Sequence, residues 1–289
     1  MSMIDTLPRT RSYSTIRVDS DGADDSHWLY MHAGQQPGTR PCFQSQMLDD
    51  VLAALSALTT QQHHQRKSAL KHLVIASDAN VFNLGGDLAL FSDLIRRQDR
   101  NQLLSYAHRC VSGVHQLHRG LAGDVRTIAL LQGDALGGGL EIALACHTIV
   151  AEEGVMMGLP EAIFDLFPGM GAYSFLCKRM PAHLAEKIIL EGNLYSSEQM
   201  HAMGVVDVLV PKNQGKEAVR NLIRTQRRSQ HSYLAMNTAR NLVQPVTLQE
   251  LKAVTEVWVD SALALDEKSL RTMDRLVRAQ TRRLQDVAA

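Results

Sequence analysis

Residues 127–145 read TIALLQGDALGGGLEIALA, and this stretch is the most informative part of the chain about its fold. Its first five residues are apolar or β-branched, which predicts a buried strand. Three consecutive glycines, Gly137 to Gly139, then remove the Cβ atoms where a backbone would approach a ligand closely. The small apolar residues that follow predict a helix that begins at these glycines.

The glycine turn has two interpretations at this point. The first turn of a helix carries backbone N–H groups without internal partners and the positive end of the helix dipole. It can therefore stabilise an anion, including an oxyanion formed during a reaction. A glycine turn can also serve only to let a helix pack on a sheet, and three residues do not decide between the two.

The composition limits the classes of protein. The chain has 289 residues, of which 45% are hydrophobic, as expected for a globular protein with a sizeable core. The formal net charge is zero, so nothing favours nucleic acid or an anionic membrane as a partner. No apolar run approaches the roughly 20 residues that span a bilayer, and the N-terminus lacks the basic-then-apolar pattern of a signal peptide.

The cysteine and histidine patterns favour neither disulfides nor metal. The pair His63–His64 has no carboxylate or cysteine at ligand spacing, so we expect no metal site there. The cysteines lie far apart without a CxxC pair, which is typical of free thiols in a reducing cytoplasm. They are Cys42, Cys110, Cys146 and Cys177. We therefore expect a cytoplasmic protein.

Strand and helix patterns alternate along the first 210 residues. Apolar runs predict strands at 13–18, 28–32, 70–76, 125–132 and 205–210. Apolar residues at helical spacing predict helices at 44–58, 88–97, 101–118 and 181–190. Asp87 is placed to cap one of these helices, and the polar stretch 61–67 is expected to be an exposed connector. This order predicts an α/β core with crossover connections.

The pattern changes at Pro211. Beyond it only helical patterns remain, at 217–227, 231–242, 248–265 and 268–283. We therefore divide the chain into an α/β core over 1–210 and a helical C-terminal region over 211–289.

Several short motifs resemble those of the enoyl-CoA hydratase/isomerase (crotonase) superfamily. Residues 82–87, FNLGGD, resemble its F-x-x-G-x-D loop, and residues 132–141, QGDALGGGLE, resemble its x-G-x-A-x-G-G-G-x-E segment. Residues 158–171 contain its P-E…P-x-x-G pattern, and residues 203–207, MGVVD, resemble its M/L-G-L-V-D motif. Because the motifs occur together in the family's order, the chain is identified as a member of this superfamily.

The resemblance implies a fold, an assembly and a site. The fold is a spiral of stacked ββα turns with a C-terminal helical region, and the assembly is a homotrimer or hexamer. Two backbone N–H groups, which fall on Leu84 and Gly138, would form an oxyanion hole for a thioester carbonyl. The catalytic glutamates fall on Glu141 and Glu161, and no cofactor is implied. Further substrate contacts are expected at Gly85, Leu136, Met170 and Trp258.

Three longer stretches resemble the bacterial diffusible-signal-factor synthases: residues 81–91, 152–175 and 267–280. That resemblance implies dehydration of a (3R)-3-hydroxyacyl chain on acyl carrier protein to the cis-2-enoyl thioester. Hydrolysis would then release a free cis-2-unsaturated fatty acid, of the C12 class, for quorum sensing. A sensor kinase is a further partner that such enzymes can have.

The two glutamates suit this chemistry. Removing water across C2–C3 needs a base for the C2 proton and an acid for the departing hydroxyl group. Two carboxyl groups do this if their surroundings keep one ionised and one protonated. The sequence does not say which glutamate is the acid, and it arranges no Ser, Cys or His triad.

Two other functions stay open. The chain could be an ordinary enoyl-CoA hydratase or isomerase, or a non-catalytic crotonase-fold regulator that binds a sensor kinase. Asp165 and Ala172 stand where many family hydratases have glycine. Cys42 stands where coenzyme A binders commonly have a basic residue, which favours an acyl chain carried on a protein.

Overall fold

The protein, as a computed structural model, is described over residues 12–22, 24–34, 38–64 and 69–288, with the side chains of 61–64 and 283–288 left aside. A six-stranded sheet with the order β1-β2-β3-β4-β6-β9 forms its centre. The first pair of strands is antiparallel, and the other pairs are parallel. The strands are β1 (Ile16–Asp21), β2 (Ser26–Met31), β3 (Lys71–Ser77), β4 (Val125–Leu131), β6 (Thr148–Glu152) and β9 (Val208–Val210).

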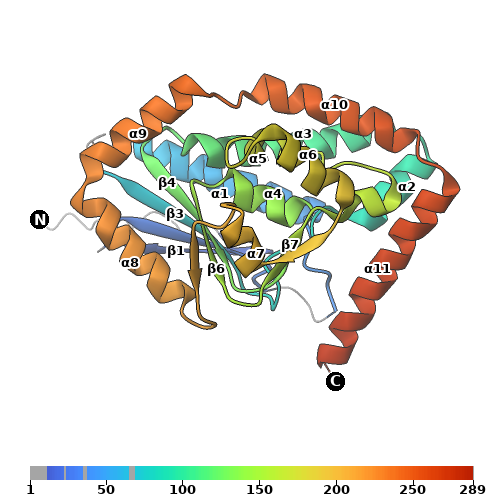
Figure 1. Ribbon diagram of the computed structural model, residues 1–289, viewed down its shortest axis with the longest axis horizontal. Coiled ribbons are helices and arrows are strands. Elements are labelled where there is room, and N and C mark those ends of the chain that lie inside the picture. The colour runs from blue at the N-terminus through green and yellow to red at the C-terminus, as the bar shows by residue number, and fades with distance from the viewer. Residues whose placement is uncertain (1–11, 23, 35–37, 65–68, 289) are drawn as a thin grey trace, which may run out of the picture.

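Helices connect the parallel strands (Figure 1), so the α/β prediction is confirmed. The crossovers are α1 (Ser45–His64), α2 (Leu88–Arg96), α3 (Arg100–Arg119) and α4 (Gly138–Ala145). A second, three-stranded sheet contains β5 (Ala135–Leu136), β7 (Met156–Gly158) and β8 (Leu194–Ser196). The short helices in this part of the chain are the 3₁₀ helix η1 (Pro160–Phe164), α5 (Ala172–Leu176), α6 (Ala182–Glu191) and α7 (Ser197–Ala202).

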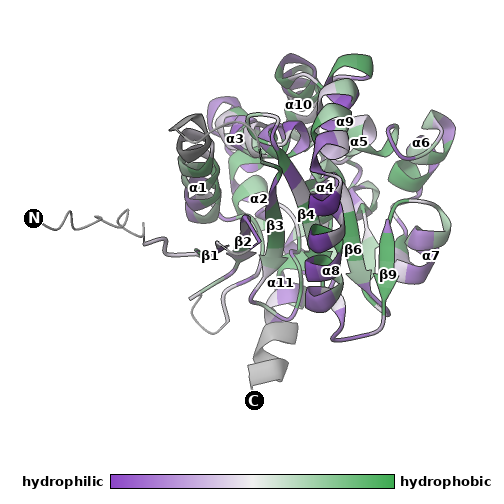
Figure 2. Ribbon diagram, turned by 90° about the vertical axis from the view of Figure 1, so that its left-hand side faces the viewer, coloured by the Kyte–Doolittle hydropathy of each residue, from purple (hydrophilic) through white to green (hydrophobic). Residues whose placement is uncertain are grey.

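Strand β4 shows why the sheet is buried on both faces. Its side chains alternate between two hydrophobic clusters, because successive residues of a strand point to opposite faces. Ala129 and Leu131 belong to the large cluster, whereas Ile128 and Leu130 belong to a smaller one. In Figure 2, strands β6 and β9 of the same sheet are also green, the colour of hydrophobic residues.

Four helices follow β9: α8 (Gly215–Arg228), α9 (Gln230–Val243), α10 (Leu248–Leu263) and α11 (Glu267–Ala288). Helix α8 covers one face of the sheet through Val219 and Ile223. Helix α10 packs on α3, and α11 packs on α2 and η1. Figure 1 shows α10 and α11 at the red end of the colour range. No described helix has both the length and the apolar composition needed to cross a membrane.

Three predicted boundaries are wrong. Helix α1 continues to His64, so residues 61–64 are helical rather than a connector, and the histidine side chains there lie outside the described residues. Strand β9 begins at Val208 instead of 205, because the amides of Val205 and Val206 both donate to Met200 O at the end of α7. Strand β1 begins three residues later than predicted, at Ile16.

Candidate active site

The glycine turn of residues 137–139 packs against the loop of residues 82–87. Asn83, which is fully buried, joins the two segments. Its carbonyl O accepts a hydrogen bond from the Leu136 amide at 3.0 Å, and its side-chain Oδ1 accepts one from the Gly85 amide at 2.7 Å. These bonds fix the main chain of the loop against the start of α4.

The glycines of the turn are required by close contacts. Gly137 has φ +51°, and a Cβ there would lie 2.5 Å from Oε1 of Glu161. A Cβ on Gly139 would lie 2.1 Å from the carbonyl O of Asn83. Both separations are too short for a real Cβ, and a positive φ also favours glycine. The turn therefore brings two main-chain segments and a carboxyl group together, which is more than helix packing requires.

Two neighbouring backbone N–H groups, those of Gly86 and Gly138, have no acceptor within the described part of the chain. Gly138 opens α4, so its N–H is one of the groups that a helix leaves without an internal partner. A Cβ on Gly138 would lie 3.5 Å from Gly86 N, and both glycines line the same cavity. They offer the pair of donors that an oxyanion needs.

The prediction that Leu84 supplies one of these donors is wrong. The Leu84 amide donates to the carbonyl O of Pro41 at 2.8 Å, so it is not available to a ligand. The available donor lies two residues further along, at Gly86. The adjacent glycines Gly85–Gly86 are a sequence signal for it, but the engagement of the Leu84 amide depends on Pro41, in a distant segment of the chain.

Glu141 lies in α4, and only 2% of its surface is exposed. Its Oε1 accepts hydrogen bonds from the backbone amides of Met170 at 2.7 Å and Ala172 at 2.9 Å. Burial raises the pKa of Glu141 to about 7, and the two amides act in the opposite direction by stabilising the anion.

Glu161 lies in η1, directly after Pro160. Its carboxyl Oε2 is buried and has no hydrogen-bond partner among the described residues, although part of the residue faces solvent. Burial, followed by the charge of Glu141, raises the pKa of Glu161 to about 8. Because Glu141 has two amide donors and Glu161 Oε2 has none, a proton shared by the pair rests on Glu161.

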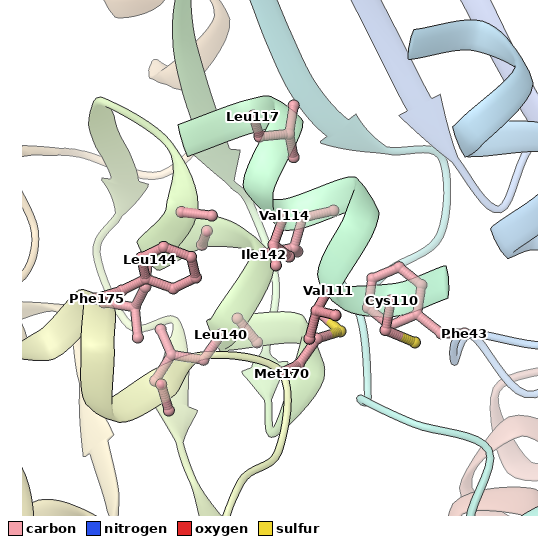
Figure 3. Close-up of a cluster of buried hydrophobic side chains, with 14 of the residues drawn as sticks. Phe43, Cys110, Val111, Val114, Leu117, Leu140, Ile142, Leu144, Met170 and Phe175 are labelled. Atoms are coloured by element: carbon pink, nitrogen blue, oxygen red, sulfur yellow. The ribbon is translucent and has the colours of Figure 1, made fainter. Parts of the chain in front are cut away.

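Both carboxyl groups line one cavity of about 60 Å³. That volume holds a few water molecules, so a long acyl chain can enter only if the walls move. The rest of the wall is mainly apolar and aromatic: Phe43, Leu88, Phe91, Tyr106, Ala107, Cys110, Phe164, Leu166, Met170 and Trp258. Three of these residues, Phe43, Cys110 and Met170, also belong to the buried hydrophobic cluster drawn in Figure 3.

The expected substrate contacts divide into two groups. Met170 and Trp258 line the cavity, whereas Gly85 and Leu136 are not among its lining residues. The Trp258 ring packs against the Phe91 ring, with their centroids 5.2 Å apart. Sequence reasoning missed Phe91, although it follows the F-x-x-G-x-D loop by one helical turn.

A second missed residue is Tyr106 of α3. Its ring packs edge-on against Phe91, with centroids 5.1 Å apart. Its hydroxyl group donates to the carbonyl O of Phe43, and burial raises its pKa well above the ordinary value. Tyr106 therefore stays neutral and acts as a wall of the cavity. The described residues contain no cluster of three or more His, Cys, Asp or Glu side chains that could hold a metal ion.

Comparisons with known proteins agree with this geometry. The family model "Enoyl-CoA hydratase/isomerase" matches residues 35–268. The chain is 33% identical over 177 residues to human "Enoyl-CoA hydratase domain-containing protein 2, mitochondrial", which covers 55% of each protein. It is 30% identical over 146 residues to the Arabidopsis thaliana "Peroxisomal fatty acid beta-oxidation multifunctional protein AIM1", covering 50% of this chain and 20% of that protein. The matches thus span about half or less of these relatives.

Solved structures show the same fold. An enoyl-CoA hydratase from Bacillus halodurans superposes with a TM-score of 0.74 at 18% identity, covering 90% of this chain and 98% of the other. DspI from Pseudomonas aeruginosa superposes with a TM-score of 0.66 at 23% identity, covering 83% of this chain and 84% of the other.

Proposed function

Because this chain belongs to the enoyl-CoA hydratase/isomerase family, we propose that it dehydrates a 3-hydroxyacyl thioester and hydrolyses the product to a free cis-2-unsaturated fatty acid. The observation that carries the proposal is one cavity that contains two carboxyl groups and two amides without an acceptor. These groups are Glu141, Glu161, Gly86 and Gly138.

In the dehydration step, one carboxylate removes the C2 proton of the thioester. Negative charge then develops on the carbonyl oxygen, where the amides of Gly86 and Gly138 stabilise it by roughly 3–4 kcal/mol per donor. The second carboxyl group protonates the departing C3 hydroxyl group, which leaves as water. The pair starts and ends with one proton between its members, so it needs no outside acid or base to complete the step.

In the hydrolysis step, a carboxylate of the same pair takes a proton from a water molecule. That water attacks the thioester carbonyl carbon, and the oxygen of the tetrahedral intermediate occupies the position between the same two amides. The carbon–sulfur bond breaks, and the thiol of the carrier leaves with a proton from the pair. The products are the free fatty acid and the carrier thiol.

The packing of α11 supports the signal-synthase proposal over a general hydratase. Parts of the three stretches that resemble those synthases lie in neighbouring elements, because α11 contacts both α2, which begins with residues 88–91, and η1. Asp274 of α11 accepts from Ser92 Oγ at 2.8 Å and from Arg96 at 2.9 Å, and Met273 is fully buried.

The carrier and the assembly are also proposals. Cys42 is fully buried and carries no positive charge for a coenzyme A phosphate, which supports acyl carrier protein as the carrier. A homotrimer or hexamer would cover apolar side chains that are exposed in the single chain. The most exposed of these on α9 and α10 are Met236, Leu242, Val243 and Val257.

Product analysis tests the proposal. The purified protein is incubated with (3R)-3-hydroxydodecanoyl-acyl carrier protein, and the lipids are identified by mass spectrometry. We expect a free cis-2-enoic acid, and none with Glu141→Gln or Glu161→Gln. Hydration of a trans-2-enoyl-CoA without release of free acid would instead establish the second candidate, an enoyl-CoA hydratase, which the 33% identity to the human relative favours. Inactivity on both substrates would leave the regulator hypothesis.

A further inference from the structure

A second hollow lies at the opposite end of α4 from the glycine turn. Helix α4 has eight residues, so its two ends are about 12 Å apart. The hollow has a volume of about 370 Å³. Its lining comes from residues that follow helices α4, α5 and α7 and from the C-terminal end of α9. Its polar lining includes His147, Lys178, Arg179, Asp207 and Arg240.

The charges in this hollow do not balance. Asp207 is the carboxylate of the lining, and it is already engaged by Arg179 at 3.0 Å and by the amide of Ile149 at 2.6 Å. Arg179 is held further by the carbonyl groups of Val205 and Cys146. Apart from Asp207, which Arg179 already engages, the lining of the hollow contains no carboxylate to balance the charges of Lys178 and Arg240.

Arg240 is half-buried, and its guanidinium group makes no hydrogen bond or ion pair with the described residues. Burial, followed by the charges of Arg179 and Arg126, lowers its pKa to about 10. The guanidinium group remains charged at neutral pH and is confined beside other cations. Such a group gains more from an anion than an exposed arginine does, because less solvent screens the interaction.

His147 supplies an independent observation. It is 7% exposed, and its Nδ1 accepts a hydrogen bond from the Thr127 amide at 3.1 Å, so the ring proton lies on Nε2. His147 lines the hollow, and its Nε2–H is buried and has no partner in the described part of the chain. Burial and the neighbouring Arg126 hold the pKa of His147 well below its ordinary value, so the ring is neutral. A buried donor without an acceptor is destabilising, which an oxygen ligand would correct.

We propose that this hollow binds a phosphate group, either as free orthophosphate or as part of a small phosphomonoester. Its oxygens accept from Nε2–H of His147, from the guanidinium group of Arg240 and from the ammonium group of Lys178. These donors come from three separate elements around one concavity, which suits a compact anion with several acceptor oxygens. A planar guanidinium group binds such an anion through two hydrogen bonds. The site is independent of the proposed activity.

Calorimetric titration of the full chain tests the proposal, with orthophosphate and AMP as separate probes in a chloride buffer. We expect saturable binding of one phosphate per chain that Arg240→Met weakens at least about tenfold. The control, Arg224→Met, changes an exposed arginine on α8 and leaves the affinity unchanged. Tighter binding of AMP than of orthophosphate assigns the site to an ester, and the reverse order assigns it to the free ion.

A second measurement uses the wild-type protein only. The ¹⁵N NMR signal of the His147 Nε2–H group is expected to shift as phosphate is added, with the same saturation curve. The proposal is overturned if neither probe binds saturably, or if Arg240→Met binds phosphate as the wild type does. It is also overturned if Arg240→Met only breaks an oligomer in light scattering, because a carboxylate of a second copy then fills the hollow.

Discussion

Replacement of Glu161 by glutamine should stabilise the protein while it removes activity. The carboxyl group of Glu161 loses its proton near pH 4.5 in the unfolded chain and near pH 8 in the folded one. Between these values the folded state binds more protons than the unfolded state, so the free energy of unfolding falls as the pH rises. Glutamine has the same size and no charge to desolvate, so the variant avoids this loss.

The shift in the pKa of Glu161 sets the size of the change in unfolding free energy. A rise in pKa from 4.5 to about 8 corresponds to on the order of 5 kcal/mol, at about 1.4 kcal/mol per unit. Part of this belongs to repulsion by Glu141, which the variant also relieves. We therefore expect the stability difference between Glu161→Gln and the wild type to grow by several kcal/mol from pH 5 to pH 8.

Urea unfolding followed by circular dichroism, at half-unit steps between pH 5 and pH 8.5, measures this difference. Titrating groups other than Glu141, such as the buried histidines, are shared by both proteins and cancel in the comparison. Glu198→Gln is a matched control, because Glu198 is exposed. A stability difference that stays constant over this pH range would refute the view that Glu161 is a buried, unpartnered acid.

Three other changes test the site. Glu141→Gln should lower kcat at least about 100-fold in activity assays. Thermal unfolding should show little loss of stability, because the glutamine Oε1 can still accept hydrogen bonds from the amides of Met170 and Ala172. Gly137→Ala should lower both kcat and stability, because its Cβ would lie 2.5 Å from Oε1 of Glu161. The expected loss of unfolding free energy is about 1–3 kcal/mol, which calorimetry measures, and activity assays measure kcat. Trp258→Ala should shift the product toward longer chains, and an unchanged product spectrum by mass spectrometry would remove Trp258 from the substrate path.

The secondary elements around the site could be predicted from local residue patterns alone. The apolar run of β4, the glycines before α4 and the Asp87 cap each act through neighbours a few residues away. Asp87 accepts from the Leu90 amide as predicted for an N-cap. Because such patterns depend on local sterics and hydrogen bonding, they can be read from the chain and support the α/β fold and the two glutamates as candidates.

Which polar groups are free to act depends on contacts that form when the chain folds. The amide of Leu84 is taken by Pro41, which leaves Gly86 as the donor. The proton of the carboxyl pair rests on Glu161 because the chain after η1 turns its amides toward Glu141. A hydrogen-bond donor belongs to whichever acceptor the fold brings nearest, and burial then sets the charge that a side chain can carry. Both depend on contacts between distant segments, so no local pattern predicts them.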